Sequence, residues 1–501
     1  MSKIHITISN ANYGVIISDG AIAVVFSKFI RRFTKFSMVY NARIKEYIPQ
    51  ISNRYYGYCG RNKEYRLPIS TLPALSNALR ENRVLRDDIC VVYDKDYLTV
   101  PLDVELRELP FELAEYQHTY INIASDSEPI RFIDLEPGKG KTTIATRALA
   151  AVNLRTAIVV IPNYIEKWSS ELGKYYNIEE SEYIVIRGNE SLKQLMSMTA
   201  IPYKFIIFSM RTLMNYITAY EEDEAFDTGM IPPQYLMQHL GVGTVFNDEA
   251  HQEFYSLYKI MCYFDAKKFI AQTATLNNLQ KDIEFYYYTL FPEESRIKGI
   301  VEFPPHIDVM PVRYFINGNY RLNFRRAQGY NHILYEQSIM KYNKLLTAYV
   351  KMIIKYLDDK YISRRVDGEK ALIFASSIAL CRYICSEIKK VYPKLNVTTY
   401  VEKDPQINLY NSDICVTTPA GGGTAHDIAG LITVINTVSL ISIQKNQQNP
   451  NRLREIPGRE VWYVYFYTPK IPNHRDMHVK RMDAMRKYTK KFVHDTYNIT
   501  A

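Results

Sequence analysis

The chain has 501 residues, of which 47% are hydrophobic and 23% are charged. This length exceeds what one hydrophobic core covers, so the chain is expected to form roughly three units with the composition of a soluble globular protein. No stretch of the sequence approaches the roughly 18 consecutive apolar residues of a membrane span, and the first ten residues lack the layout of a secretory signal, which predicts a cytoplasmic protein without a membrane partner.

The net charge of +9 is concentrated at the two ends of the chain. Residues 1–66 hold eleven Lys and Arg against three Asp and Glu, and residues 470–491 hold eight against two. Within the first region, residues 28–36 interleave Lys and Arg with Phe, a mixture that suits backbone phosphates together with exposed bases. Two basic ends favour a polyanionic partner, and solvated surface charge is the alternative.

The first hundred residues are predicted to form a small α+β domain. Short runs of β-type residues lie at 4–9, 14–18 and 21–26, with turn residues between them. Residues 70–82 have a polar start and apolar residues at helical spacing, which predicts a helix. For residues 28–36, the alternative to a nucleic-acid contact is one amphipathic strand with its polar edge in water.

From about residue 104, apolar strands alternate with helices. The first series of expected strands comprises 130–135, 157–161, 183–186, 205–208, 244–247 and 269–273. A second series begins near residue 345 and comprises 371–375, 397–400, 413–417, 431–436 and 460–467. Short apolar runs separated by helices predict an α/β fold with parallel sheets covered by helices. Residues 304–344 are interpreted as a connector, whose Asn317-Gly318 pair is a strong hairpin signal.

A glycine-containing segment follows the first of these strands and opens a helix predicted over residues 141–151. Glycines let backbone N–H groups face a bound phosphate, and the start of a helix adds positive potential. Lys141 is expected to reach the β- and γ-phosphates of a nucleotide, and Thr142 to bind Mg²⁺. The common pattern has Gly where this chain has Leu135, and a chance glycine turn is the alternative. The residues assigned to nucleotide binding here are Pro137, Gly138, Lys139, Gly140, Lys141, Thr142 and Thr143.

Two adjacent carboxylates end the strand expected at 244–247 and are followed by His251. Asp248 at the strand tip is expected to hold Mg²⁺ through water, and Glu249 to polarise the water that attacks the γ-phosphate. A helix cap with an acidic first turn is the alternative. The pair lies about 110 residues after the glycine segment, several strand–helix units further on, and this position favours the catalytic interpretation.

These motifs, in this order, resemble those of superfamily 2 helicases and translocases of the DEAH-box type over about residues 110–460. In the first half, Gln117 corresponds to the upstream glutamine that contacts adenine, with Phe111 as a stacking partner. The segment 158–162, ending at Pro162 and followed by Trp168, is similar to the first strand-contacting element. The next such element contains Ser209, Arg211 and Thr212, and Thr273-Ala274-Thr275 is similar to the element that couples the nucleotide site to strand movement.

The second half of the resemblance begins with residues 372–376, where Ser376 belongs to a turn that touches the nucleic-acid backbone. Residues 417–428 resemble the element TTxxxGTGxDI, which implies nucleic-acid contacts by Thr418, Gly423 and Thr424 and a nucleotide contact by Asp427. Residues 448–455 resemble QxxGRxxR. There, Arg452 is assigned as the finger that stabilises the transferring phosphate, and Arg454 as a second one. Two departures stand out: Asn451 replaces Gly, and Glu455 stands where the second Arg is expected.

The resemblance implies two tandem RecA-like lobes with ATP between them, contacted by Lys141 and Glu249 from one lobe and by Arg452 from the other. The expected division is a basic α+β accessory domain, an ATP-binding lobe, a connector and a second lobe with a basic tail, at residues 1–100, 101–303, 304–344 and 345–501. This order resembles phage recombination helicases such as UvsW and, more loosely, RecG. It implies a monomer that uses ATP and Mg²⁺ to unwind or branch-migrate single-stranded, forked and four-way DNA, moving 3′ to 5′.

A strand-separating wedge is expected at one of two turns, Asn317-Gly318 or Pro457-Gly458, and an ordinary surface hairpin is the alternative for each. The basic residues 480–491 are interpreted as an amphipathic helix that lines the DNA path or packs as a plain terminal helix. Three other functions stay open: a double-strand translocase that does not separate strands, an RNA helicase, and a binding protein with a decayed ATP site. DNA and RNA are not distinguished by these residues, since that depends on contacts to the sugar 2′ position.

Overall fold

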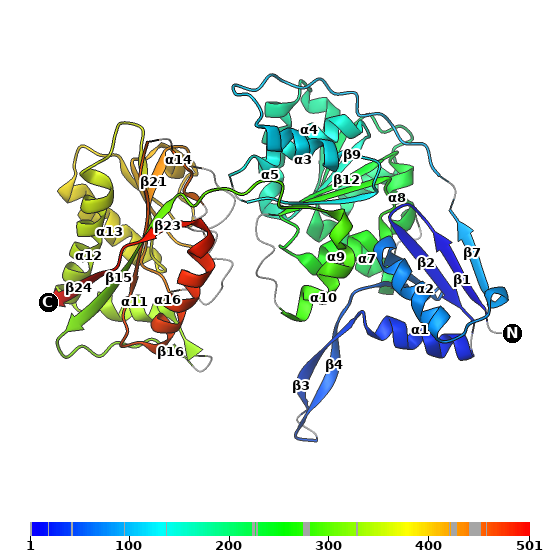
Figure 1. Ribbon diagram of the computed structural model, residues 1–501, viewed down its shortest axis with the longest axis horizontal. Helices are drawn as coiled ribbons and strands as arrows, with labels where there is room; N and C mark the ends of the chain where they lie inside the picture. Colours follow the sequence, from blue (N-terminus) through cyan, green and yellow to red (C-terminus); the bar gives the residue numbers. More distant parts are fainter. Residues whose placement is uncertain are drawn as a thin grey trace. The chain divides into compact units, whose positions relative to one another are not determined.

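The computed structural model describes residues 3–18, 20–41, 44–94, 96–136, 138–222, 226, 229–273, 281–326, 329–419, 421, 428–439, 452–456 and 458–500. The chain divides into two compact units, Met1–Val301 and Glu302–Ala501 (Figure 1). Within the described ranges, no helix is both long and apolar enough to cross a membrane.

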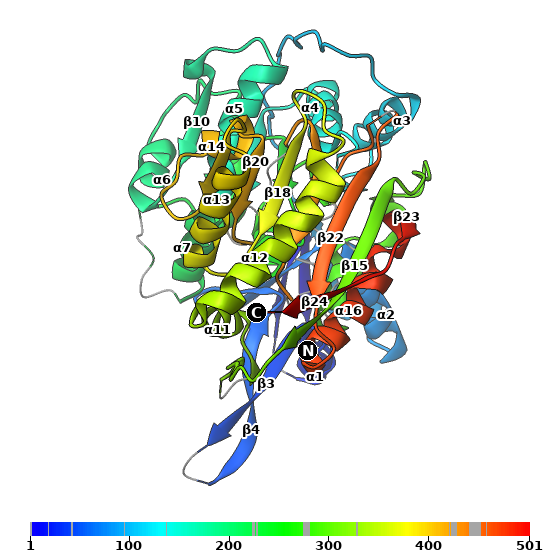
Figure 2. The ribbon, with the colours of Figure 1, turned by 90° about the vertical axis from the view of Figure 1, so that its left-hand side faces the viewer.

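The first unit begins with a small α+β domain. Its sheet has the strand order β5-β6-β2-β1-β7 and carries the helices α1 (Ala21–Arg31) and α2 (Leu72–Glu81). A separate two-stranded hairpin of β3 (Thr34–Asn41) and β4 (Glu46–Arg54) projects from this domain, as Figures 1 and 2 both show. The strands of the sheet are β1 (Ile4–Ile8), β2 (Asn12–Ile17), β5 (Gly57–Cys59), β6 (Glu64–Pro68) and β7 (Ile89–Tyr93).

The strand predicted at residues 21–26 is wrong, because these residues form the first half of α1. Their composition is β-like, but the buried side chains of the whole segment are Ile22, Phe26, Phe29 and Ile30, which lie on one helical face. Residues 28–36 are likewise not one strand: they span the end of α1 and the start of β3. The helix predicted at 70–82 is confirmed as α2.

The larger sheet of the first unit has seven parallel strands in the order β10-β11-β9-β12-β13-β8-β14. Its strands are β8 (Ile130–Asp134), β9 (Thr156–Val160), β10 (Tyr183–Ile186), β11 (Phe205–Ser209), β12 (Thr244–Asp248), β13 (Lys268–Thr273) and β14 (Arg296–Ile297). The helices of this lobe are α3 (Glu115–Ala124), α4 (Lys141–Val152), α5 (Ile165–Tyr175), α6 (Asn189–Met196), α7 (Met210–Glu222), α8 (Pro233–His239), α9 (Phe254–Tyr263) and α10 (Lys281–Leu290).

The small domain and this lobe share one hydrophobic core. Buried polar contacts reinforce the junction: Lys259 on α9 donates to both oxygens of Glu221 on α7, at 2.5 and 2.8 Å, and to the carbonyl of Tyr56 at 2.6 Å. The backbone N–H of Tyr58 donates to the same carboxylate at 3.1 Å. The N-terminal domain is therefore docked on the first lobe rather than tethered to it.

The second unit contains a sheet in the order β19-β20-β18-β21-β22-β15-β23, with β24 pairing parallel to β15 (Figure 2). Its strands are β15 (Ile307–Asn317), β18 (Lys370–Phe374), β19 (Val397–Tyr400), β20 (Ile414–Thr417), β21 (Leu431–Asn436), β22 (Val461–Tyr467), β23 (Thr489–Phe492) and β24 (Asp495–Thr500). Its helices are α11 (His332–Met340), α12 (Asn343–Leu357), α13 (Ile378–Val391), α14 (Ile407–Asn411) and α16 (Pro472–Met485), and β16 (Arg325–Arg326) pairs with β17 (Gly329–Tyr330).

The two large sheets have the same topology. When the strands of each sheet are numbered by their own order along the chain, from β8 in one and from β15 in the other, both read 3-4-2-5-6-1-7. Each sheet is parallel and covered by helices, as the alternation of strands and helices predicts. The fold is thus two tandem RecA-like lobes with a small α+β domain at the start of the first.

Two predictions for the second unit are wrong. Residues 304–344 are no mere connector, because β15 lies inside the sheet between β22 and β23. β15 pairs parallel with each of its partners, so Asn317-Gly318 ends a sheet strand and does not turn into an antiparallel hairpin. The basic tail 480–491 is a helix only to Met485. A 3-10 turn over Arg486–Tyr488 follows, and residues 489–492 form β23, because they complete the edge of a parallel sheet that a local helical pattern does not reveal.

Candidate active site

The glycine segment between β8 and α4 has the backbone that phosphate binding requires. Gly138 and Gly140 have φ values of +75° and +80°, which lie in the left-handed region that favours glycine. Gly140 precedes the first residue of α4, so the free N–H groups of the helix start at this loop. The Lys141 ammonium lies over the loop and donates to the carbonyls of Leu135 at 3.2 Å and Glu136 at 3.4 Å. The loop thus places one cation and several amides at one point.

The glutamine element packs directly against this loop. Gln117 on α3 is 7% exposed, and its amide donates weakly to the Lys139 carbonyl at 3.5 Å. A Cβ on Gly140 would overlap the Gln117 amide nitrogen, so the close approach requires glycine at that position. Tyr116 also donates to the Lys139 carbonyl, at 3.1 Å. The two side chains therefore hold the shape of the loop.

Phe111, the residue expected to stack on adenine, precedes α3 in an irregular segment and is 52% exposed. Thr142 is half-buried at the start of α4. Thr143 is buried and its hydroxyl is 2.8 Å from the Tyr175 hydroxyl, so this side chain ties α4 to α5. Of the two threonines, Thr142 is the one whose position fits a metal ligand.

Asp248 ends β12 as a buried carboxylate whose two oxygens both accept hydrogen bonds. One oxygen accepts from the Lys167 ammonium at 2.8 Å and from the Trp168 indole N–H at 2.9 Å. The other accepts from the Gln272 amide at 2.8 Å. Burial alone would raise the pKa of Asp248, but the charge of Lys167 and these hydrogen bonds outweigh it and hold the pKa below its usual value. Asp248 is therefore ionised at neutral pH and rigidly oriented.

Glu249 follows in the left-handed region, with φ +56°, an uncommon conformation for a residue with a side chain. Its carboxylate lies 3.2 Å from the His251 ring nitrogen and accepts a long 3.5 Å contact from the Thr273 hydroxyl. The His251 nitrogen and the Thr273 hydroxyl are themselves 2.5 Å apart. Burial raises the pKa of Glu249, but His251 and the charge of Lys141 outweigh this and lower it. A half-buried, ionised carboxylate near Lys141 is suited to orienting a nucleophilic water.

The donor set fits Mg²⁺ bound through water more readily than direct coordination. Oxygen ligands and a carboxylate suit this cation, which keeps several of its waters. Asp248 already accepts from Lys167 and Trp168 at one oxygen and from Gln272 at the other, so about one of its four lone-pair sites, on the oxygen that faces Gln272, is left for a water. The residues that would hold the ion are Thr142 and Asp248, and the bound ion would supply charge neutralisation at the phosphates.

The residues expected to touch nucleic acid from the first lobe differ in exposure. Pro162 and Arg211 are exposed, the latter in the first turn of α7. Ser209 is buried at the end of β11, and Thr212 is buried with its hydroxyl accepting from the Gly188 N–H at 2.8 Å. The Thr212 hydroxyl therefore stabilises the first lobe internally and does not face outward. Trp168 is fully buried and serves Asp248 rather than a strand-contacting surface.

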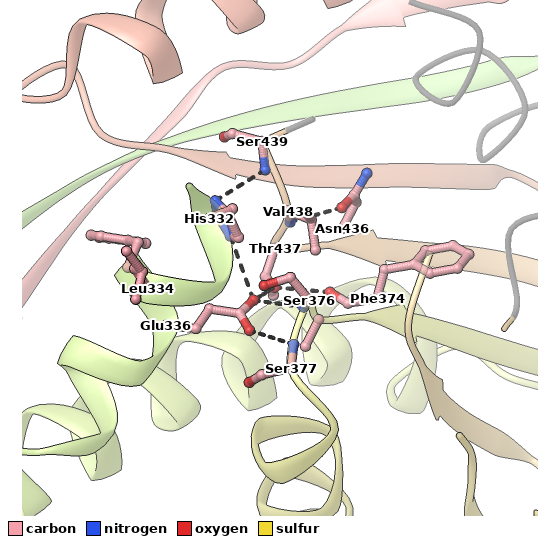
Figure 3. A network of polar contacts seen from close by, with 12 residues as sticks. His332, Leu334, Glu336, Phe374, Ser376, Ser377, Asn436, Thr437, Val438 and Ser439 are labelled. Atoms are coloured by element: carbon pink, nitrogen blue, oxygen red, sulfur yellow. Dashed lines mark hydrogen bonds and ion pairs between the residues drawn. The ribbon is translucent and has the colours of Figure 1, made fainter. Parts of the chain in front are cut away.

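In the second lobe, Ser376 lies in a turn fixed by a buried carboxylate (Figure 3). Glu336 on α11 is 0% exposed and accepts from the backbone N–H groups of Ser376 and Ser377, both at 2.8 Å. These groups precede α13, so the carboxylate also meets the positive end of that helix. Burial raises the pKa of Glu336, but His332 and the Ser376 N–H outweigh it and lower the pKa.

His332 belongs to the same cluster. One ring nitrogen is 3.5 Å from the Glu336 carboxylate, and the other accepts from the Ser439 N–H at 3.4 Å, as the dashed lines in Figure 3 mark. The Tyr330 hydroxyl bridges His332 and His474 on α16. Burial keeps the pKa of His474 well below its usual value, so this histidine is neutral. The Ser376 turn is thus held by α11 and α16 together.

The other assigned residues of the second lobe are partly described. Thr418 is half-buried after β20 and accepts from the Gly421 N–H at 3.2 Å. Arg452 is 5% exposed, whereas Arg454 is half-buried. The structure leaves other predicted residues outside its described ranges, namely Pro137, Ala274, Thr275, Gly423, Thr424, Asp427, Asn451 and Pro457.

Three residues around Asp248 and Ser376 were missed in the sequence. Lys167 lies on α5, Gln272 near the end of β13, and Glu336 on α11, each far along the chain from the group it contacts. The one available signal for Gln272 is its position next to Thr273 at the end of a strand. Lys167 and Glu336 carry no local signal, since a lysine or a glutamate on a helix is ordinarily solvated.

Comparison with known proteins supports the helicase interpretation for the first lobe. Residues 110–278 match the family model described as type III restriction enzyme, res subunit. This segment contains the loop before α4, the Asp248-Glu249 pair and Thr273, which are the groups assembled at the site above. The match covers most of the first lobe and supports the helicase resemblance seen in its motifs.

No curated protein sequence matches the chain. Among solved structures, T4 UvsW is similar with 14% identity and a TM-score of 0.36, over 99% of this chain and 100% of that one. S. cerevisiae Dbp5 bound to RNA and ADP BeF3 is similar with 11% identity and a TM-score of 0.46, over 77% of this chain and 90% of that one. At these values neither likeness contributes to the argument, which rests on the family match and the site.

Proposed function

We propose that the protein is a DNA helicase that uses ATP hydrolysis to unwind or branch-migrate forked and four-way DNA in replication, recombination or repair. The observation that carries the ATP chemistry is the ionised pair of the buried Asp248 and the half-buried Glu249 beside the Lys141 loop. The basic N-terminal domain, docked on the motor lobe, favours a branched substrate, because it offers a second cationic surface besides the lobes. We further propose a cytoplasmic monomer that moves 3′ to 5′.

In this proposal Lys141 neutralises the β- and γ-phosphates, and Glu249 orients the attacking water. Asp248 and Thr142 hold Mg²⁺, with Asp248 acting through water. Arg452 and Arg454 of the second lobe stabilise charge on the transferring phosphate. Contacts to the nucleic acid run along its backbone, so no sequence preference is expected.

The test measures ATP turnover and strand separation with single-stranded DNA, linear duplex, a fork, a four-way junction and RNA. Stimulation by fork or junction well above that by linear duplex is expected. Lys141→Ala and Glu249→Gln should abolish turnover while DNA binding survives, whereas Lys174→Ala, an exposed lysine on α5, should change neither. Loss of DNA binding in both active-site variants would contradict the roles given to these residues.

A second function is favoured by the family match. The matched model is that of a restriction-enzyme subunit, which favours a double-strand translocase that moves without separating strands. Equal stimulation of turnover by plain duplex and fork, with no strand separated, would select this function over the helicase. Stimulation by RNA alone would select an RNA helicase instead.

A further inference from the structure

The hairpin β3–β4 carries a row of exposed apolar side chains that do not belong to the hydrophobic core of the first unit. In its cross-strand register Phe36 lies opposite Ile51, Met38 opposite Pro49, and Tyr40 opposite Tyr47. Residues directly opposite each other, and residues two apart on one strand, lie on the same face of a ribbon. These six residues therefore form one apolar face, called here the hairpin face.

The hairpin face is open along its length. The exposed fractions of its side chains are 43% for Phe36, 60% for Met38, 51% for Tyr40, 66% for Tyr47 and 45% for Ile51. An isolated two-stranded ribbon is at best marginally stable in water, and a contiguous exposed apolar patch ordinarily marks a binding surface. The Tyr40 and Tyr47 rings, 5.4 Å apart, form an aromatic pair at the outer end of this face.

The surroundings of the hairpin face are strongly basic. Residues 28–54 hold seven Lys and Arg against one acidic residue, Glu46. The Arg31 guanidinium lies over the Phe36 ring at 5.8 Å, so charge and aromatic surface meet at the base of the hairpin. Aromatic rings flanked by cations suit a polymer with stacked bases and a phosphate backbone. A protein partner would need a strongly acidic surface to match this positive charge.

The base of the hairpin is fixed to the motor lobe. Tyr55, just after β4, stacks on Tyr286 of α10 at 3.7 Å between ring centroids, with the rings 10° from parallel. Phe33, just before β3, lies 5.9 Å from Phe285 of the same helix, and the Arg32 guanidinium lies over that ring at 5.7 Å. The eight residues of β3 give an arm of roughly 25 Å beyond this anchor. The arm is therefore carried by the lobe that binds ATP.

We propose that the hairpin is a nucleic-acid-binding arm whose face, Phe36 to Tyr40 and Tyr47 to Ile51, stacks against unpaired bases where the strands of a fork separate. The cations around it contact the adjacent phosphates. This inference rests on the proposed function for the kind of substrate, and it places the strand-separating contact in the N-terminal domain rather than at Asn317-Gly318 or Pro457-Gly458.

The experiment uses the full chain and two fluorescein-labelled DNA probes, a synthetic fork and a single strand of equal length. The variant combines Tyr40→Ser with Tyr47→Ser, and a second combines Phe36→Ser with Met38→Ser. The control is Tyr93→Ser, a tyrosine on β7 of the same domain that is more exposed (75%) than Tyr40 or Tyr47. Each hairpin variant should bind the fork about tenfold more weakly or worse, since loss of stacking on even one base has this effect. Turnover stimulated by the single strand should change less than about twofold, because the ATP site is untouched.

Fork affinity and unwinding equal to wild type in both hairpin variants would overturn the proposal. So would an equal loss in Tyr93→Ser, since the effect would then not belong to the hairpin face. A change from dimer to monomer in the variants, with fork affinity unchanged, would overturn it in favour of self-association. Failure of the proposed function looks different: the wild-type chain would then show no nucleic-acid-stimulated turnover on any probe. Fork binding by the hairpin remains measurable in that case.

Discussion

The two lobes share one strand order but differ in the residues at the ends of corresponding strands. The fifth strand of the first sheet, β12, ends at Asp248 and is followed by Glu249, whereas the fifth strand of the second sheet, β21, ends at Asn436 and is followed by Thr437. Asn436 is buried and neutral, donating to the Tyr463 hydroxyl at 2.7 Å and accepting from the Val438 N–H at 2.8 Å. The same position thus holds an ionised carboxylate in one lobe and a hydrogen-bonded, neutral amide in the other.

The first strands of the two sheets show the same contrast. β8 runs into a glycine loop and straight into α4, whose start faces the loop. β15 ends at Asn317, and the next helix, α11, begins only at His332. A phosphate site needs a helix start directly after the strand, and one of the two lobes provides it. Topology therefore fixes where a site can be, and the local residues decide whether there is one.

The largest effect is expected at the fifth strands. Asp248→Asn gives the first lobe the residue of the second, removes the charge proposed to hold Mg²⁺ through water, and should lower ATP turnover by about 10²-fold or more. The counterpart Asn436→Asp should cost stability by burying a charge but leave turnover per folded molecule unchanged. Phosphate release under saturating ATP measures the turnover of both variants, and urea unfolding measures the stability of Asn436→Asp. Similar losses of turnover in the two variants would show that the lobes do not differ in the way described.

The next effect concerns the cation that balances Asp248. Lys167→Met leaves a buried carboxylate without its ion-pair partner and should lower the free energy of unfolding of the first unit by about 3 kcal/mol. Lys174→Met on the same helix removes a partner of Glu171 at an ammonium that is 61% exposed, and should change it by less than about 0.5 kcal/mol. Urea unfolding gives both values. Equal stabilities of the two variants would show that Lys167 does not stabilise the buried Asp248 carboxylate.

A smaller effect is expected in the second lobe, at Glu336. Glu336→Gln places an amide N–H₂ against the N–H groups of Ser376 and Ser377 and should lower the free energy of unfolding by about 2 kcal/mol at pH 7. The folded-state pKa of Glu336 is depressed, so its stabilisation is present above the unfolded pKa of about 4.3 and is lost as pH falls through the folded value. The gap between the unfolding free energies of wild type and variant should therefore narrow below about pH 4.3, as urea unfolding at pH 7 and pH 3 measures. Glu402→Gln, at a carboxylate that is 57% exposed, is the control. A gap that widens in acid would contradict the assignment.

The smallest effect is expected after β15. Gly318 has φ +122°, and a Cβ there would lie 2.8 Å from a ring carbon of Tyr320. Gly318→Ala should destabilise the second unit by about 1 kcal/mol and leave fork unwinding unchanged, because the turn ends a sheet strand. Thermal unfolding and an unwinding assay measure the two outcomes. A loss of unwinding at unchanged stability would restore this turn as the wedge.

Much of the fold was predictable from local pattern. The strands of both lobes are short, fully buried runs such as Ile206–Phe208 and Ile432–Ile435, and in a parallel sheet such runs stand out from the helices between them. Prediction failed where tertiary pairing overrides the local pattern. β15 and β23 carry polar residues, which in the sequence alone are typical of loops. Two of these residues, Asp308 on β15 and Lys491 on β23, form an ion pair at 3.3 Å between the neighbouring strands.

The same division holds for the site. Lys141, Asp248 and Glu249 were predicted because each lies at a strand end or helix start within a recognisable motif. Lys167 and Gln272 were not, because they meet Asp248 across 81 and 24 residues of chain. Their effect on the pKa of Asp248 exists only in the folded lobe.

The sequence by itself indicated the resemblance to helicases, because that resemblance depends on glycines, a lysine and two carboxylates at fixed places relative to strand and helix. Only the tertiary structure decided that the second lobe begins with β15, that a lysine balances Asp248, and that the basic, aromatic residues after α1 form an open hairpin. The physical reason is the distance along the chain over which each kind of interaction acts. Motif residues act through backbone geometry a few positions away, whereas ion pairs, strand pairing and exposure depend on which distant segments the fold brings together.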